Sequence, residues 1–339
     1  MNILGYRKDL SVKYKNQNIS EMLNPHLKNW SYTDNLSGQI DDLQIVLEDV
    51  ADKWAKSWFP KKTSSLSIEI VEKINGATLK TAIGSFEIDE ITGRGPAMEV
   101  TLKASALPQK STLKGTQKSK VWEKATLKTI FSDIAKRNNM KIFYQSSDTE
   151  KIDRVEQEHE TDIAFLYRFA KERGLCLKIT NLQIVVLDEE DLEKNKTKGS
   201  FKKDFKSTDD YKILTWEFTT NLTGVARSCT VKHQDTKKKK VIQGSFTPKN
   251  PPDVARTLVL KESISSTAEA NRLAKKKLRE ANKDAETMTM VIHTTKHINA
   301  GDTYNVVGFG FMDGKYIVTQ VVNNPSAKSV SLRKCLEGY

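Results

Sequence analysis

His293 and His297 lie four positions apart, a spacing that places two metal ligands on one face of a helix. The sequence around His293, MTMVIHTT, instead alternates apolar and polar residues and is rich in β-branched side chains, which predicts a strand. Residues four apart on a strand are about 13 Å from one another, too far to bind one ion. We therefore expect both histidines to be structural.

Two groups of acidic residues are further candidates for chemistry. The first consists of Asp188, Glu189, Glu190 and Asp191. It lacks the alternating acids and the central glycine of a calcium loop. The second group precedes a predicted helix and consists of Glu156, Glu158, His159, Glu160 and Asp162. Carboxylates there suit the positive end of a helix, and they are also the candidates for a general acid–base pair. Solvated capping is the favoured interpretation.

The glycine-rich segment GFGFMDG, residues 308–314, does not match a phosphate-binding loop. It lacks the GxGxxG spacing, and strand-like sequence flanks it on both sides, whereas a phosphate site needs a helix N-terminus after the glycines. Tyr304 and Val306 alternate before it, as Tyr316 and Val318 do after it. We therefore predict a β-hairpin with an Asp-Gly turn.

The three cysteines, Cys176, Cys229 and Cys335, are single and widely spaced, which predicts buried reduced thiols rather than a zinc or redox site. The sequence also lacks GxSxG, HExxH and Cys-His signatures. We predict no catalytic residue, no cofactor and no bound metal. The chemistry of this chain is expected to be assembly rather than catalysis.

The 339-residue chain is basic, with 55 Lys and Arg against 43 Asp and Glu and a net charge of +12. This balance favours an acidic partner, which could be nucleic acid, an anionic membrane or a protein. The run Lys237–Lys240 falls where a hairpin tip is expected, and no aromatic residues interleave with it, so a solvated loop is favoured. No apolar run of eighteen residues and no secretory signal are visible, so we expect a cytoplasmic protein.

The segment VADKWAKSWFP, residues 50–60, gathers aromatic side chains. Val50, Trp54 and Trp58 would lie on one stripe of a helix that Pro60 ends, with Phe59 beside them. Core packing is the favoured interpretation. The alternative is that this stripe binds a neighbouring subunit.

The periodicity of the chain changes from β to α/β and back to β. Alternating apolar residues between 34 and 106 predict strands of a small barrel or sandwich. Leu127, Ile130, Phe131 and Ile134 predict one helix, and Thr161 or Asp162 begins a second helix that ends near Gly174. From Ile213 the pattern is again β, interrupted by one helix with a Ser266–Glu269 capping box.

We therefore divide the chain into a first β domain (1–107), an α/β domain (108–190), a charged connection (191–212) and a second β domain with one inserted helix (213–339). The fold class is α+β and mainly β. This layout permits an internal duplication of the β domain, but no residue-level repeat is apparent.

Three groups of residues form one recognisable pattern. The first helix contributes Trp122, Leu127, Ile134 and Ala135, and the second contributes Asp162, Phe165, Leu166, Ala170 and Gly174. The C-terminal part contributes Glu280-Ala281-Asn282, Gly301-Asp302, Gly308-Phe309-Gly310 and Gly314-Lys315-Tyr316. With these residues the chain resembles the late control protein D family over about residues 80–339. This family comprises the baseplate hub proteins of contractile phage tails and tail-like bacteriocins, which are similar to the N-terminal part of VgrG-type spikes.

The resemblance implies two related tube-type β-barrel domains flanking a peripheral α/β domain. It also implies a homotrimer whose six barrels form a pseudo-sixfold ring between a sixfold tail tube and a threefold spike. The implied partners are a tube or tube-initiator protein, a spike and other baseplate proteins, with no small-molecule substrate and no specific nucleic acid. The chain would be made in the bacterial cytoplasm and incorporated into a virion or tail-like particle. Because many relatives continue into a spike domain and this sequence stops at Tyr339, we expect a separate spike polypeptide.

Two other functions stay open on the sequence alone. One is a peptidoglycan hydrolase that uses the acidic group near Glu156. The other is a nucleic-acid-binding module, for which the net charge is the only argument.

Overall fold

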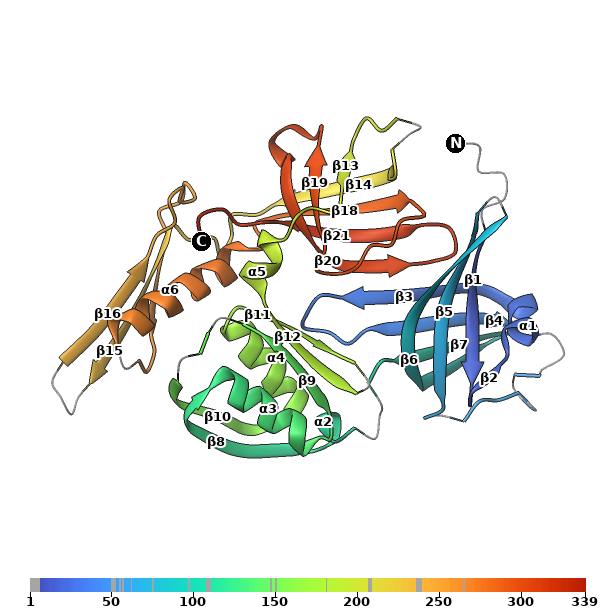
Figure 1. The fold of residues 1–339 in the computed structure, drawn as a ribbon, viewed down its shortest axis with the longest axis horizontal. Helices are drawn as coiled ribbons and strands as arrows, with labels where there is room; N and C mark the ends of the chain where they lie inside the picture. Colours follow the sequence, from blue (N-terminus) through green and yellow to red (C-terminus); the bar gives the residue numbers. More distant parts are fainter. Residues whose placement is uncertain are drawn as a thin grey trace.

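The computed structural model describes residues 7–49, 53–54, 56, 58–61, 63–74, 76–96, 98–107, 111–146, 148–149, 151–180, 182–206, 209–235, 240–264 and 266–339. It is mainly β, with two β domains, an α/β unit and a further unit in which one helix covers a small sheet (Figure 1). The predicted fold class is confirmed.

The first β domain is a curved sheet around an apolar core. Its elements are β1 (Arg7–Tyr14), β2 (Gln17–Asn18), α1 (Ser20–Leu23), η1 (Asn24–His26), β3 (Leu27–Asn35), β4 (Asp42–Glu48), β5 (Ser65–Ile74), β6 (Ala77–Arg94) and β7 (Glu99–Ser105). Alternate residues of these strands point into one core that includes Leu10, Trp30, Ile45, Ile68 and Phe86. The period-two pattern of the sequence is therefore confirmed as a one-faced sheet.

The α/β unit contains the two predicted helices. Its elements are α2 (Thr112–Gly115), β8 (Gln117–Thr126), α3 (Leu127–Arg137), β9 (Lys141–Gln145), β10 (Lys151–Thr161), α4 (Asp162–Glu172), β11 (Leu175–Ile179) and β12 (Gln183–Asp188). Thr126 and Thr161 cap the two long helices through their hydroxyl oxygens. Gly174 follows α4 at φ +65°, the left-handed conformation expected of a C-terminal glycine. Both helices bury their apolar stripes in a single core.

The second β domain begins with α5 (Glu189–Lys194) and β13 (Ser200–Lys202). Apart from the first two residues of α5, both elements lie inside the segment 191–212 that was expected to be a charged connection. It continues with β14 (Lys212–Thr220), β18 (Glu286–His293), β19 (Thr303–Val307), η3 (Gly310–Met312), β20 (Gly314–Asn323) and β21 (Lys328–Lys334). The strands β19 and β20 form the predicted hairpin, but its loop is longer than an Asp-Gly turn. The Asp313 carboxylate accepts hydrogen bonds from Gly308 N at 3.1 Å and Phe309 N at 2.6 Å, and so closes that loop.

Between β14 and β18 the chain leaves this domain and forms a separate unit of β15 (Ser228–Asp235), β16 (Lys240–Phe246), β17 (Thr257–Lys261) and α6 (Thr267–Asn282). These strands were expected to belong to the second β domain, because alternation identifies a strand but not its sheet. In the structure α6 packs on this three-stranded sheet with a core of its own. A Cβ at Gly244 would lie 2.5 Å from Ala270 Cβ, so only glycine permits this close packing.

The two β domains repeat one strand order. The first runs β3-β4-β7-β6-β5-β1 and the second runs β14-β18-β21-β20-β19-β13. Taken in chain order, the six strands of one domain match the six strands of the other one by one. The one difference in direction is that β13 pairs parallel with β19 while β1 pairs antiparallel with β5.

The positions of the β-bulges extend this repeat to single residues. In the β3–β4 ladder the register shifts between Leu27 and Asn29, and in the β14–β18 ladder it shifts between Ile213 and Thr215. The ladders β6–β7 and β20–β21 share a second shift, after Ile88 in one and after Val318 in the other. Aligning the bulges matches residues 27–35, LKNWSYTDN, with residues 213–221, ILTWEFTTN. The β domain is therefore duplicated, and only Trp, Thr and Asn are identical in this segment.

The two copies meet edge to edge. Strand β3 of the first pairs antiparallel with the C-terminal half of β20 of the second, which joins both domains in one large sheet (Figure 1). The junction pairs Asn35 with Gln320 and Tyr32 with Asn323. Leu36 N also donates to Thr319 O at 2.9 Å.

Candidate assembly interface

The candidate metal and catalytic residues are separated by the fold. His293 ends β18, and His297 lies exposed in the loop that follows, so the two are not on one strand as expected. Burial and the neighbouring Lys212, Lys328 and Lys8 lower the pKa of His293. Within the described ranges, no group of three or more His, Cys, Asp or Glu side chains is arranged to hold a metal.

The acidic group before α4 contains a buried ionic anchor. Thr161 caps the helix, whereas Asp162 is 0% exposed and accepts hydrogen bonds from Lys118 Nζ at 2.7 Å, Asn138 Nδ2 at 2.8 Å and Gln157 Nε2 at 2.9 Å. Arg137 also pairs with it. Burial raises the pKa of Asp162, but these hydrogen bonds outweigh burial and hold the pKa below its usual value.

Solvated capping was therefore wrong for Asp162, which ties β8, α3 and β10 to the start of α4. Two other carboxylates of the group have basic partners. Glu156 pairs with Arg154, and Glu160 pairs with Arg168. Asp162, a buried carboxylate with cationic partners and a lowered pKa, is poorly suited to act as a general acid.

The second acidic group forms the start of α5 and connects three elements. Asp188 caps the helix by accepting from Glu190 N at 3.2 Å. Arg333 of β21 binds Glu189 at 2.9 Å and Glu193 at 2.6 Å, and Arg279 of α6 binds Glu193 at 2.9 Å. All four of these charged side chains are buried. Sequence patterns do not reveal this cluster, because its arginines lie 86 and 140 residues from Glu193 along the chain.

A third ionic cluster connects the α/β unit to both β domains. Lys178 of β11 pairs with Asp34 of β3 and, at 2.8 Å, with Asp41. Ala300 N of the second β domain donates to the other oxygen of Asp34 at 2.8 Å. Burial lowers the pKa of Lys178, but the two carboxylates outweigh this and raise it. The α/β unit is therefore fixed where the two β domains meet.

The aromatic segment before Pro60 does not form the predicted stripe, since its described residues are turns and Val50 lies outside the described residues. Trp54 is buried in the core of the first β domain, which confirms the favoured interpretation for that residue. Trp58 packs edge-on against Trp54 with ring centroids 5.7 Å apart, and Phe59 is 53% exposed. Together they line a mostly apolar cavity of about 270 Å³.

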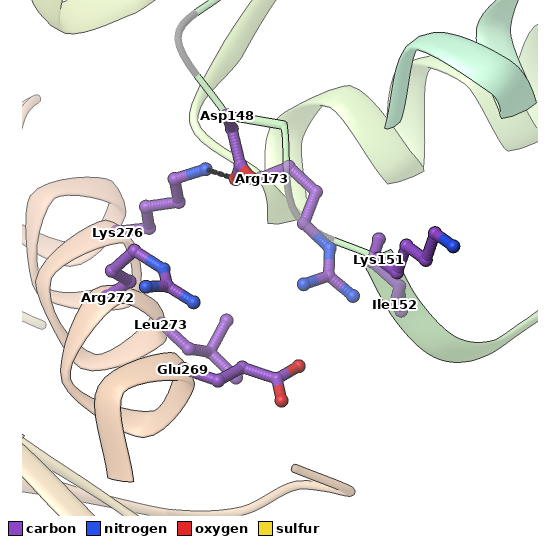
Figure 2. Close-up of a pocket in the computed structure, with 8 residues that line it drawn as sticks. All are labelled: Asp148, Lys151, Ile152, Arg173, Glu269, Arg272, Leu273 and Lys276. Atoms are coloured by element: carbon purple, nitrogen blue, oxygen red, sulfur yellow. Dashed lines mark hydrogen bonds and ion pairs between the residues drawn. The ribbon is translucent and has the colours of Figure 1, made fainter. Parts of the chain in front are cut away.

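A smaller cavity lies where α6 faces the α/β unit (Figure 2). Lys276 pairs with Asp148 at 2.6 Å across it, and the Arg173 guanidinium lies between the two bodies. Its volume of about 30 Å³ is that of a single small molecule such as water. We interpret it as part of the contact that positions α6.

Strand β14 is the most exposed of the long strands in the described sheets. It ends the large sheet, with β18 on one side and no described strand on the other. Eight of its nine residues are exposed, including Trp216 at 41% and Phe218 at 38%. Phe309 and Phe311 from the β19–β20 loop pack edge-on against these rings. Apolar surface on an unpaired edge strand is typical of an interaction site.

A second edge without a described neighbouring strand lies on the C-terminal half of β6. This strand pairs with β5 through Glu87, and Ile88 exchanges hydrogen bonds with Ser64 and Thr63. From Asp89 to Arg94 the ladder continues only on the β7 side. The last three residues of β6 are exposed.

Three of the four lysines of the run, at positions 237–239, lie outside the described residues. The flanking strands β15 and β16 pair as a hairpin with Asp235 opposite Lys240, which agrees with the predicted hairpin.

A family model described as phage tail baseplate hub (GPD) matches residues 79–325 of this chain. The chain belongs to the phage tail baseplate hub family. A relative from Escherichia phage P2, described as a probable baseplate hub protein, is 29% identical over 167 residues, which cover 49% of this chain and 41% of the relative. The matched part of the chain thus spans less than half the length of that hub relative.

Solved structures share the fold of this hub family member. The 43 kDa tail protein of prophage MuSo2 from Shewanella oneidensis superposes with a TM-score of 0.72 at 14% identity, covering 97% of this chain and 98% of that one. A tail protein from Neisseria meningitidis MC58 superposes with a TM-score of 0.71 at 13% identity, covering 96% of both chains. The resemblance stated from sequence motifs is confirmed.

Proposed function

We propose that this protein is the structural baseplate hub of a contractile injection system, a phage tail or a tail-like bacteriocin. As a homotrimer it would join a sixfold tail tube to a threefold spike. The observation that carries this proposal is the duplicated β domain, with one strand order and two matching β-bulges in both copies. Three chains then present six similar domains, so one face matches sixfold symmetry while the whole assembly stays threefold.

The mechanism in this proposal is mechanical rather than catalytic. The hub has to keep its two β domains at a fixed angle while the tube and spike pull on opposite faces. Strand pairing between β3 and β20 supplies directional hydrogen bonds for this purpose. The Asp34–Lys178 and Glu193–Arg333 clusters resist separation of the units, because removing one member leaves a buried charge unpaired.

The partners in this account are a tail tube or tube-initiator protein, a spike and other baseplate proteins, with no small-molecule substrate and no specific nucleic acid. The chain would be made in the bacterial cytoplasm and end in the particle. Among the described helices, none is long and apolar enough to cross a membrane. A peptidoglycan hydrolase is not favoured, because Glu156, Glu160 and Asp162 are held in ion pairs.

Native mass spectrometry of the purified chain, with and without the spike protein, tests the proposal. The hub account predicts a species of three times the 38.4 kDa chain mass. A chain that stays monomeric both alone and with the spike contradicts it.

A further inference from the structure

We propose that strand β14 of one chain pairs with the C-terminal half of β6 in the next chain, and that this pairing is the contact between copies. The inference rests on the proposed ring of copies and assigns the surfaces that build it. Within one chain the first β domain contributes β3 and the second contributes β20 to their junction. The repeat equates β3 with β14 and β20 with β6.

The junction inside the chain supplies the register. There Asn35 lies opposite Gln320, Asp34 opposite Val321, Thr33 opposite Val322 and Tyr32 opposite Asn323. The bulges equate Asn35 with Asn221 and Gln320 with Glu90. Between chains the same ladder therefore places Asn221 opposite Glu90, Thr220 opposite Ile91, Thr219 opposite Thr92 and Phe218 opposite Gly93. The strands run antiparallel, as they do in the junction that serves as the template.

Among the described residues, no strand pairs with either of the two edges that this pairing requires. Strand β14 has no described strand beyond it, and β6 extends past the last residue of β5 that pairs with it. Most side chains on these edges are exposed, although Ile91 is half-buried against the core of the first β domain, whereas Asn35 and Val321 of the internal junction are buried. The outer edge of β14, beside the exposed Trp216 and Phe218, offers both the backbone hydrogen-bonding groups and the apolar area that strand addition uses.

Charge complementarity identifies the occupant as a second copy. One residue further along the inferred register, Glu217 lies opposite Arg94. Both side chains are exposed. The template holds Ser31 and Asn324 at the corresponding places, so this charge pair is specific to the contact between chains. Opposite charges directly across an antiparallel pair stabilise it, and like charges destabilise it.

Charge reversal tests the assignment. Glu217→Arg and Arg94→Glu are each expected to raise the concentration at which the trimer half-dissociates by at least tenfold, since each places like charges opposite one another. The double variant is expected to return to within about threefold of the wild type, because the pair is restored with its signs exchanged. Lys80→Glu, on the exposed first half of β6, is the matched control and is expected to have no effect.

Disulfide trapping tests the register independently. In the template, Leu36 and Thr319 form a hydrogen-bonded pair, so Thr33 and Val322 form a non-hydrogen-bonded pair, whose Cα atoms are closest. The equivalent chain-to-chain pair is Thr219→Cys with Thr92→Cys, which we expect to crosslink into covalent trimers under mild oxidation. Thr219→Cys with Lys80→Cys is the out-of-register control and is expected to stay uncrosslinked.

The outcomes separate this inference from the proposed function. One outcome is a wild-type trimer that neither single charge reversal weakens and in which the Thr219–Thr92 cysteine pair does not crosslink. This result overturns the strand pairing and leaves the hub proposal standing. A wild-type chain that is monomeric alone and with the spike overturns the hub proposal itself. Near-identical thermal unfolding of each variant monomer shows that the substitutions act on assembly rather than on folding.

Discussion

Trp30 of β3 and Trp216 of β14 occupy the same position in the two copies of the β domain. Each tryptophan lies one residue after the end of its β-bulge, which spans residues 27–29 in β3 and 213–215 in β14. Trp30 is 1% exposed and Trp216 is 41% exposed. The difference follows from their neighbours. Lys8 of β1 lies over the Trp30 ring, whereas the matching strand β13 has only three residues and leaves Trp216 to Lys203 and Phe309. The second domain is therefore the more open copy, and its uncovered edge is the surface offered to a partner.

The Asp162 anchor sets a first prediction. Asp162→Ala leaves Arg137 and Lys118 without their shared carboxylate, so we expect a loss of about 3–5 kcal/mol in the free energy of unfolding. Urea unfolding measures this loss. Asp153→Ala, at an exposed position on β10, is the control and should change stability by less than about 0.5 kcal/mol. Equal effects of the two substitutions would contradict the anchor.

The same carboxylate predicts a sensitivity to acid. Because the folded-state pKa of Asp162 is held below its usual value, its contribution is fully present above the unfolded pKa of about 4 and is lost as the pH falls through the folded value. The stability difference between wild type and Asp162→Ala should therefore shrink below pH 4. A difference that stays constant from pH 7 to pH 3 would show that the charge is irrelevant.

Lys178 predicts how the units are held together. Lys178→Met leaves Asp34 and Asp41 buried without their cation, which we expect to cost about 3–5 kcal/mol and to expose the unit boundaries to protease. Lys194→Met, which removes a surface pair with Glu190, should cost at most about 1 kcal/mol. Limited proteolysis of both variants, followed by mass analysis of the fragments, distinguishes a junction lysine from an ordinary surface lysine.

Lys8 predicts an unusual rise of stability with pH. Burial and, to a smaller extent, the nearby charge of Lys328 lower the pKa of Lys8 to about 7, and the carboxylate of Glu72 acts in the opposite direction. His293 is a further titratable group near Lys8. Between pH 7 and 10 the unfolded chain binds more protons at this site than the folded chain, so stability rises by up to about 1.4 kcal/mol per pH unit. Lys8→Met should remove that slope. An unchanged slope in the variant would assign it to other groups.

The secondary-structure elements and the family could be predicted from the sequence, but the pairing of residues far apart in the chain could not. Helices α3 and α4 and the hairpin of β19 and β20 follow from local periodicity and caps. The repeat was hidden because sheet ladders conserve the side-chain alternation and not the residue types, so that Leu27 matches Ile213 and Tyr32 matches Phe218. Only the shared bulges align the two copies.

The ionic clusters were hidden for a different reason. Asp34 and Lys178 are 144 residues apart, and nothing local distinguishes them from solvated surface charges. The strands β15, β16 and β17 were expected in the second β domain, but they form a separate three-stranded sheet under α6. The reason is the same, because strand pairing depends on long-range contacts that periodicity does not report.

Negative-stain imaging of the assembled chain tests the central claim most directly. The hub account predicts a threefold ring with a central channel and six lobes of similar size around it, one for each copy of the duplicated β domain. A ring with three lobes, or a particle without a channel, would contradict the claim that the two β domains of each chain act as equivalent parts of one ring.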